Sequence, residues 1–194
     1  MTRFVLATAN EDKAREIRDI LGPSVTLLPR PASVPDVAET GVTLLENARL
    51  KARALATATG EAAIADDTGL EVDSLGGAPG VYSSRYAGEG ASYADNVAKL
   101  VKAVAGVRGP HKARFRTVAV AAWPDGEEVV AEGLVEGAIA DAARGEAGFG
   151  YDPVFIPADG DGRTFAEMTA GEKHVLSHRG RAFRALADRL SERR

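Results

Sequence analysis

The sequence predicts an α/β protein with a mixed β-sheet and flanking helices, because segments of helical spacing alternate with short apolar segments of strand length. Asn10, Thr43 and Ser92 are residue types that often cap the start of a helix, and each precedes a segment of helical spacing. Residues 124–126, Pro-Asp-Gly, are typical of a tight turn between antiparallel strands. Strands separated by helices favour parallel pairing, so the expected sheet contains both kinds of neighbours.

The boundaries of these elements follow from periodicity and from turn residues. Strands are expected over residues 3–9, 25–28, 62–65, 70–72, 115–123, 128–135 and 153–156. Helices are expected over residues 11–21, 44–59 and 93–105, with a short helix after Thr164 and a last helix from Ser177 to about Leu190. The glycine-rich segments 76–80 and 146–152 predict a loop and a turn. The sequence holds no internal repeat or linker, which predicts a single domain over residues 1–194.

Composition indicates an ordinary globular protein and excludes several classes. Hydrophobic residues make up 45% and charged residues 27% of the chain, a balance that disordered proteins lack. No apolar run approaches the roughly 18 residues of a membrane helix, and only a short one precedes Asn10, so we expect a cytoplasmic protein. The absence of cysteine excludes disulfides and a cysteine nucleophile. A net charge of -4 argues against a nucleic-acid polymer as a partner.

The first cluster of polar residues lies where residues 3–9 give way to a helix. Thr8, Asn10 and Lys13 stand at this turn. A helix N-terminus offers unpaired backbone N–H groups and a positive dipole end, which suit phosphate. The G-x-x-x-x-G-K-[ST] pattern of a P-loop is absent. An ordinary helix cap with a surface lysine is the alternative interpretation.

The second cluster is a pair of adjacent acids, Asp66 and Asp67, after an apolar strand. Buried carboxylates are costly unless cations neutralise them. Successive strand residues point to opposite faces, so at most one of the two is expected to face a ligand. Magnesium uses one or two protein carboxylates beside phosphate, which fits this pattern, whereas a plain Asx turn is the alternative. Glu39 supplies a further carboxylate near a helix start.

Two further clusters offer contacts for a purine base. In residues 148–153, glycines flank Phe149, whose ring is suited to stacking on a base, and Asp152 is suited to accepting a hydrogen bond from a purine N–H. Lys173, His178 and Arg179 supply donors, which favour the O6 acceptor of a 6-oxo purine over the amino group of adenine. A bulged turn with a core aromatic and a basic surface loop are the respective alternatives.

Taken in order, these clusters resemble one family, the inosine/xanthosine triphosphate pyrophosphatases, which remove noncanonical purine nucleotides. The matching stretches are LATANEDKAREI, AETGVTLLENARLKARALA, AIADDTGLEVDSLGGAPGVYSSRYAG, GFGYDPVFIP and FAEMTAGEKHVLSHRGRAF. They run from residue 6 to residue 183 and so cover nearly the whole chain.

The resemblance implies a homodimer with an elongated mixed sheet and two lobes around a nucleotide cleft. It implies magnesium-dependent hydrolysis of XTP, dITP and ITP to the nucleoside monophosphate and pyrophosphate. It carries over Asp67 and Lys13 as catalytic residues, with Asp67 as proton acceptor for the attacking water, and Glu39 and Asp67 as magnesium ligands. The implied substrate contacts are Thr8, Ala9, Asn10, Lys13, Thr68, Phe149, Gly150, Tyr151, Asp152, Lys173, His178 and Arg179. Thr68 stands where the family often has serine.

Three other interpretations remain at this point. A related pyrophosphatase acting on pyrimidine or methylated nucleotides differs only in its base pocket. A nucleotide sensor that binds triphosphate without cleaving it is disfavoured by the paired acids. A dinucleotide oxidoreductase is weaker still, because residues 76–80 do not follow the G-x-G-x-x-G spacing.

Overall fold

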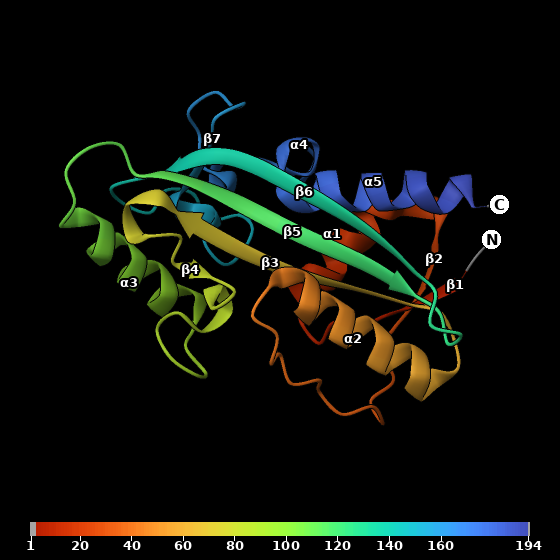
Figure 1. The fold of residues 1–194 in the computed structure, drawn as a ribbon. Helices are drawn as coiled ribbons and strands as arrows, with labels where there is room; N and C mark the ends of the chain where they lie inside the picture. The colour runs from red at the N-terminus through yellow and green to blue at the C-terminus, as the bar shows by residue number, and fades with distance from the viewer. Residues whose placement is uncertain (1–2, 194) are drawn as a thin grey trace. The chain divides into compact units, whose positions relative to one another are not determined.

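The computed structural model of the protein describes residues 3–193, and within them helices and strands alternate as expected. The helices are α1 (Glu11–Leu21), α2 (Leu44–Thr59), α3 (Tyr93–Ala105), α4 (Ala170–Leu176) and α5 (His178–Glu192). The strands are β1 (Arg3–Leu6), β2 (Thr26–Leu28), β3 (Ala63–Val72), β4 (Pro79–Gly80), β5 (Lys112–Ala122), β6 (Glu128–Ile139) and β7 (Phe155–Pro157). They form a mixed sheet in the order β2-β1-β3-β5-β6-β7, with β4 against β3 (Figure 1). The predicted α/β class with a mixed sheet is confirmed.

The chain folds into two compact units. Within the described residues, unit 1 comprises 3–67, 117–133 and 179–193, and unit 2 comprises 68–116 and 134–178. Strands β3, β5 and β6 contribute residues to both units. The single domain predicted over residues 1–194, a range that reaches outside the described residues at both ends, stays a prediction.

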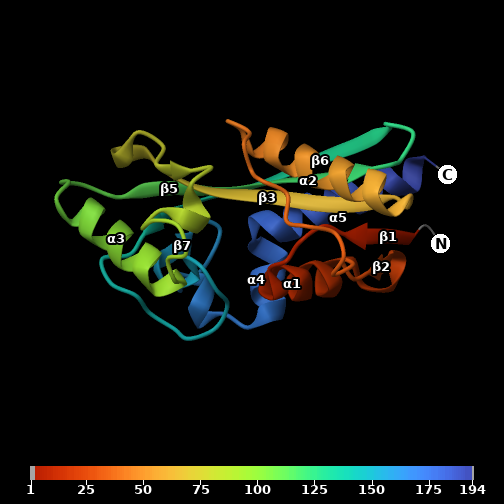
Figure 2. The ribbon, with the colours of Figure 1, turned by 90° about the horizontal axis from the view of Figure 1, so that it is seen from below.

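In unit 1 helices cover both faces of the strands, with α2 on one face and α1 and α5 on the other (Figures 1 and 2). Successive residues of these strands point in turn to one face and then to the other. One core cluster joins Phe4, Leu6 and Ile64 to residues of α1 and α5 such as Ile17 and Phe183. The other joins Val5 and Ala63 to Leu55 and Ala56 of α2. Each strand residue of unit 1 can therefore be assigned to one face or the other from its position in this alternation.

Unit 2 has its own core, in which aromatic rings pack among aliphatic side chains. The Phe115 ring of β5 lies 4.7 Å, centroid to centroid, from that of Phe155 and 6.4 Å from that of Phe165. Leu100 and Val104 of α3 belong to the same cluster. Strand β7 joins this unit by antiparallel pairing with the end of β6.

Two expectations for residues 62–80 are wrong. The strand predicted to end at residue 65 continues through the two acids, so Asp66 and Asp67 lie in the middle of β3. The strand does not break there because cations beside both carboxylates offset the cost of burying them. The predicted loop over 76–80 contains the short strand β4, which pairs antiparallel with Leu70 and Glu71.

The region before the last helix also differs from the prediction. The sequence predicted one short helix after Thr164, but the structure has two, η5 (Phe165–Glu167) and then α4, before the last helix. Thr169 caps α4 and Glu172 completes its capping box. This box directly follows that of Thr164 and Glu167, so the sequence holds two consecutive helix starts where only the first was recognised.

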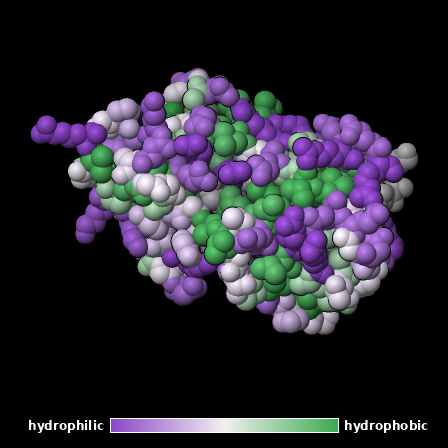
Figure 3. Space-filling model, viewed as in Figure 1, coloured by the Kyte–Doolittle hydropathy of each residue, from purple (hydrophilic) through white to green (hydrophobic). Residues whose placement is uncertain are grey.

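The outward side of α2 includes an apolar patch between charged residues. Figure 3 shows hydrophobic side chains gathered along α2 and the strands beside it. Leu50 is 40% exposed there, and it lines a cavity of about 620 Å³ together with Ala54 and Ala58.

In the part of the chain that the structure describes, no helix combines the length and the apolar character needed to cross a bilayer.

Gly137→Ala is expected to lower the free energy of unfolding by about 1–3 kcal/mol, because the added methyl would overpack the contact between β6 and β7. Its Cβ would lie 2.3 Å from the carbonyl oxygen of Ile156 and 2.6 Å from the Phe155 ring. Gly171→Ala is the control, since a Cβ there meets nothing within 4 Å and alanine favours the helix. Urea unfolding measures both variants, and equal stability of the two would contradict this packing.

Candidate active site

The turn after β1 is held by local hydrogen bonds. The Asn10 side chain caps α1 by accepting from the backbone N–H of Lys13 at 3.0 Å. The backbone N–H of Asn10 in turn donates to the Thr8 hydroxyl at 3.1 Å. Ala9 between them is exposed. Thr8 and Asn10 therefore shape the turn that presents the N-terminus of α1, while their contact with phosphate stays a prediction.

The end of β1 lies beside the acid pair of β3. The two strands are parallel, with Val5 opposite Ala63 and Leu6 opposite Ile64. Asp66 follows two residues later, and the Lys13 ammonium lies 3.3 Å from its Oδ2. The structure thus brings the turn that carries Lys13 next to the two aspartates of β3.

Asp66 points to the face of β3 that α1 and α5 cover. Besides Lys13, the guanidinium of Arg179 lies 3.5 Å from Asp66 Oδ2, and it also contacts Glu16 of α1 at 2.5 Å. All three of Glu16, Asp66 and Arg179 are buried. Burial lowers the pKa of Lys13, against the opposing charge of Asp66. Asp66 is therefore neutralised by the chain's own cations.

Asp67 points to the opposite face, toward α2. Asn47 Nδ2 donates to Asp67 Oδ2 at 3.2 Å, and the Lys51 ammonium lies 3.4 Å from Oδ1. The same ammonium contacts Glu39 Oε1 at 2.6 Å. The predicted magnesium ligands Glu39 and Asp67 thus share one lysine, which the sequence analysis did not single out.

Asn47 connects these groups to the loop before α2. Its side chain is fully buried, and its Oδ1 accepts the backbone N–H of Gly41 at 2.8 Å while its Nδ2 holds Asp67. Gly41 lies two residues after Glu39. One buried amide therefore fixes both the aspartate and the loop that carries the second acid.

The electrostatics of this side follow from burial and charge. Burial raises the pKa of Asp67, and the nearby charges of Lys51 and Lys13 oppose this only in part. Burial lowers the pKa of Lys51, but Asp67, Asp66 and Glu39 together outweigh it and leave that pKa raised. Asp67 is thus a stronger base than an exposed aspartate, and Lys51 keeps its charge.

The pair Glu39 and Asp67 fits a magnesium ion in its chemistry. Both donors are carboxylate oxygens, and they already converge on the Lys51 ammonium. Among the described residues, no group of three or more His, Asp or Glu side chains is arranged to hold a metal. An ion here would draw further oxygens from phosphate or water, as magnesium does in phosphate sites.

The other acids near this region have different partners. Glu46 completes the capping box of α2 and accepts the backbone N–H groups of Val42 and Thr43. Glu71, in unit 2, lies 3.6 Å from Arg114. Glu46 thus stabilises the start of α2, and Glu71 takes part in an ion pair of unit 2.

Unit 2 brings together three of the residues predicted to contact the base. The Lys173 ammonium contacts Asp152 Oδ2 at 2.5 Å, and both side chains are 4% exposed. Asp152 Oδ2 also accepts the backbone N–H of Phe149 at 2.8 Å. Lys173 lies 5.0 Å from the centre of the Phe149 ring. Gly148 permits this arrangement, because a Cβ there would lie 2.0 Å from Asp152 Oδ2.

The flanking residues stabilise this arrangement. The Tyr151 hydroxyl donates to the backbone oxygen of Ser83 at 2.8 Å, and burial raises the pKa of Tyr151. Gly150 has φ of 63°, a conformation that L side chains rarely adopt. Phe149 is half-buried and lies 5.7 Å from Tyr93, centroid to centroid. Phe149 thus keeps part of its ring exposed while its backbone is fixed.

The remaining predicted contacts are placed differently. His178 is buried among core rings, 4.4 Å from Phe115, centroid to centroid. Arg179 belongs to unit 1 and pairs with Glu16 and Asp66. Thr68 is half-buried on β3 at the start of unit 2. The base-contacting roles of these residues stay predictions.

Sequence reasoning missed Lys51, Asn47 and Glu16. A signal existed for the first two, since the buried stripe of α2 includes Ala48 and Leu55. Positions 47 and 51 fall on that stripe, and a lysine at an inward-facing position is an unusual residue. Glu16 gave no such signal, because its partner Arg179 is 163 positions away.

Comparison with known proteins identifies the family. The model of the Ham1 family matches residues 4–189. The chain belongs to the Ham1 family. A dITP/XTP pyrophosphatase of Streptomyces coelicolor is 48% identical over 99% of this chain and 98% of its own length. One from Thermus thermophilus is 49% identical over 96% and 90%.

Solved structures of Ham1 proteins share the fold. The HAM1 protein of Coxiella burnetii superposes with a TM-score of 0.89 and 40% identity, covering 99% of this chain and all of the other. The Ham1 protein of Staphylococcus aureus has a TM-score of 0.87 and 38% identity, covering both chains fully. The resemblance inferred from the sequence is confirmed, and this Ham1-family chain has the predicted ITPase-like fold class.

Arg179→Ala is expected to lower the free energy of unfolding by roughly 3–5 kcal/mol, because Glu16 and Asp66 would lose a buried cation. Arg3→Ala is the control, since Arg3 and Glu61 form an exposed pair at 3.1 Å. That variant should change stability by less than about 1 kcal/mol. Urea unfolding at pH 7 compares them, and equal losses would contradict the structural role assigned to Arg179.

Proposed function

We propose that this chain is a nucleoside-triphosphate pyrophosphatase that acts on deaminated purine nucleotides. It hydrolyses ITP, dITP and XTP to the nucleoside monophosphate and pyrophosphate, and so removes them from the nucleotide pool. The names of its relatives, dITP/XTP pyrophosphatases over nearly their full length, support this activity. Magnesium dependence, a homodimer and a cytoplasmic location belong to the proposal as well.

The observation that carries the proposal is the acid pair of β3 with a different lysine on each side. Asp66 pairs with Lys13, which lies at a helix N-terminus. Asp67 pairs with Lys51, and the same Lys51 ammonium also contacts Glu39. Cations suit the charges of a triphosphate, and a basic carboxylate suits activation of water. A site that only bound triphosphate would need the cations but not the buried acids.

Phosphate binding is assigned to the turn after β1. The N-terminus of α1 offers backbone N–H groups, and Lys13 lies on its first turn. When pyrophosphate leaves, negative charge grows on its oxygens, and a fixed ammonium there lowers the energy of that charge. Lys13 therefore serves both binding and turnover.

Water activation is assigned to Asp67. Its raised pKa makes the carboxylate a better proton acceptor than an ordinary aspartate, and Asn47 and Lys51 fix its orientation. Magnesium, held by Glu39 and Asp67 when bound, supplies neutralisation of phosphate oxygens. The attack of water breaks the α–β phosphoanhydride bond, with no covalent enzyme intermediate.

Base selection is assigned to Phe149, Asp152 and Lys173. A 6-oxo purine presents an acceptor at O6 and a donor at N1, where adenine presents the reverse. The Lys173 ammonium has three donors, and the Asp152 carboxylate only accepts. This pair matches hypoxanthine and xanthine and opposes adenine.

The test is pyrophosphate release from ITP, dITP, XTP, ATP, GTP, dTTP and UTP, with and without magnesium. We expect kcat/KM for ITP or XTP to exceed that for ATP roughly hundredfold, because a mismatched base leaves buried polar groups unpaired. Preference for UTP or dTTP would instead indicate a pyrimidine enzyme. Binding without release would indicate a sensor, and turnover unchanged by chelation would contradict the magnesium requirement.

Asp67→Asn is expected to lower kcat by roughly 10²–10⁴-fold, since the amide cannot take a proton from water. The fold should survive, because the amide oxygen can still accept from Asn47. Asp73→Asn is the control, an exposed acid paired with Arg114 in unit 2. Steady-state kinetics and urea unfolding measure both variants. Wild-type turnover by Asp67→Asn would remove its proposed role.

A further inference from the structure

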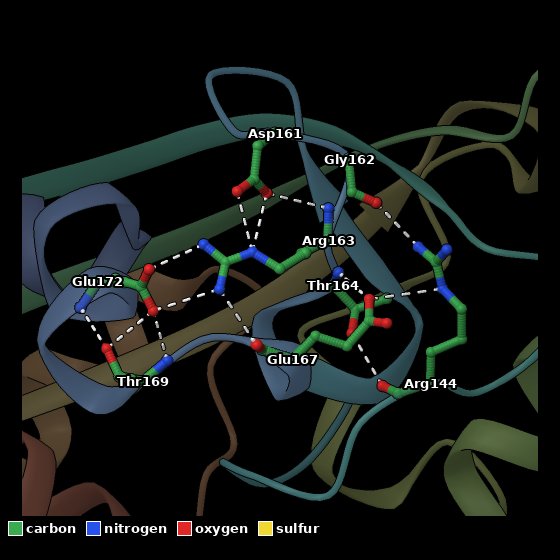
Figure 4. Close-up of polar contacts among 8 residues, drawn as sticks. All are labelled: Arg144, Asp161, Gly162, Arg163, Thr164, Glu167, Thr169 and Glu172. Atoms are coloured by element: carbon green, nitrogen blue, oxygen red, sulfur yellow. Dashed lines mark hydrogen bonds and ion pairs between the residues drawn. The ribbon is translucent and has the colours of Figure 1, made fainter.

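Two consecutive capping boxes in unit 2 are each joined to an arginine (Figure 4). Glu167 caps the short helix η5 (Phe165–Glu167), and its Oε2 lies 3.5 Å from Arg144 Nε. Glu172 caps α4, and its Oε1 accepts from Arg163 Nη2 at 2.8 Å. Each glutamate therefore does more than complete a capping box at a helix start, since it also binds an arginine side chain.

Arg163 uses its whole guanidinium to connect one turn to α4. Its Nε donates to both carboxylate oxygens of Asp161, at 2.9 and 3.1 Å. Its Nη1 reaches the backbone oxygen of Glu167 at 3.3 Å, while Nη2 holds Glu172. A planar fork with several partners fixes geometry more strongly than a single ion pair.

The same turn is tied to the segment that leads to Phe149 and Asp152. The Thr164 hydroxyl donates to the backbone oxygen of Arg144 at 2.8 Å, and Thr164 is fully buried. The backbone N–H of Ala147 donates to the oxygen of Ala166 at 3.0 Å. Residues 144–147 are thus fixed to η5 just before the segment that carries the base-contacting residues.

The ion pair of Lys173 and Asp152 links α4 to the segment 144–152, so that this segment, the turn around Arg163 and α4 all contact one another. Lys173 directly follows Glu172 on α4, and Asp152 ends the segment that begins at Arg144. Without the link from Arg163 to Glu172, α4 would keep its capping box but lose its tie to the turn. A helix of only seven residues has little stability of its own, so the contacts of α4 with neighbouring segments, this tie among them, hold Lys173 in place.

The charges of this link persist over a wide pH range. Hydrogen bonds from Arg163 and from Thr169 lower the pKa of Glu172 to about 2. The carboxylate of Glu172 is therefore ionised throughout the range in which a cytoplasmic enzyme would work.

We infer that Arg163, acting through Glu172, is a positioning residue that orients Lys173 toward the base and so sets selectivity for 6-oxo purines. Arg163 itself touches neither Lys173 nor Asp152 among the contacts described. This inference rests on the proposed function, because it assigns a supporting network to the same base-contacting residues.

The experiment compares Arg163→Ala, Glu172→Gln and the double variant in pyrophosphate release from ITP and ATP. Glutamine at position 172 keeps the capping oxygen but loses the charge pair, so it separates helix capping from positioning. Arg114→Ala is the matched control, since Arg114 is similarly exposed and pairs with Asp73 in the same unit. Urea unfolding verifies that each variant folds. If Arg163→Ala does not fold, the kinetics of Glu172→Gln alone test the inference.

We expect each single variant to raise KM for ITP roughly tenfold and to lower the ITP to ATP selectivity by a similar factor, with kcat changed less than about threefold. The double variant should be no worse than either single variant, since both remove one link. Arg114→Ala should leave KM and selectivity unchanged. Unchanged KM and selectivity in the single variants, or independent losses that multiply in the double variant, would overturn the inference.

A separate measurement distinguishes this inference from the proposed function. Wild-type protein that releases no pyrophosphate from any purine triphosphate would overturn the function itself. Amide hydrogen exchange then tests the network without turnover. Arg163→Ala should speed exchange in α4 and in residues 149–152 but not in α3, and unchanged exchange in α4 would overturn the inference.

Discussion

Two adjacent carboxylates on a buried strand carry more charge than a protein interior tolerates, and the surrounding elements are arranged to offset it. Because the side chains of a strand alternate, Asp66 and Asp67 face different helices and require different cations. Lys13 and Arg179 meet Asp66, while Lys51 meets Asp67. Lys13, which offsets the charge of Asp66, is also the cation that the proposed function assigns to the phosphates.

This arrangement divides the work between the two aspartates. Asp66 lies between two cations that come from the chain itself, which fits a structural role. Asp67 shares its lysine with Glu39 and has a raised pKa, which fits proton transfer and metal binding. In unit 2, Asp152 and Lys173 form a second buried pair whose donors and acceptors suit a purine base. The proposed function assigns the acids of unit 1 to phosphate chemistry and the pair of unit 2 to the base.

The sequence predicted the elements with strong boundary signals and failed where a contact depended on distant residues. The helices after Asn10, Thr43 and Ser92 begin as predicted, because capping is local. The continuation of β3 through two acids could not be predicted, because it depends on cations from other helices. Likewise, the sequence could have marked Lys51 as a lysine on an apolar stripe. Its two carboxylate partners could not be predicted, because they come from a loop and a strand.

The division of work between the aspartates is tested most directly by following their carboxyl carbons by NMR while magnesium is added. The account predicts that the resonance of Asp67 titrates above the usual pH for aspartate and shifts when magnesium binds. The resonance of Asp66, already held by Lys13 and Arg179, should stay where it is. A magnesium-dependent shift at Asp66 with none at Asp67 would contradict the account.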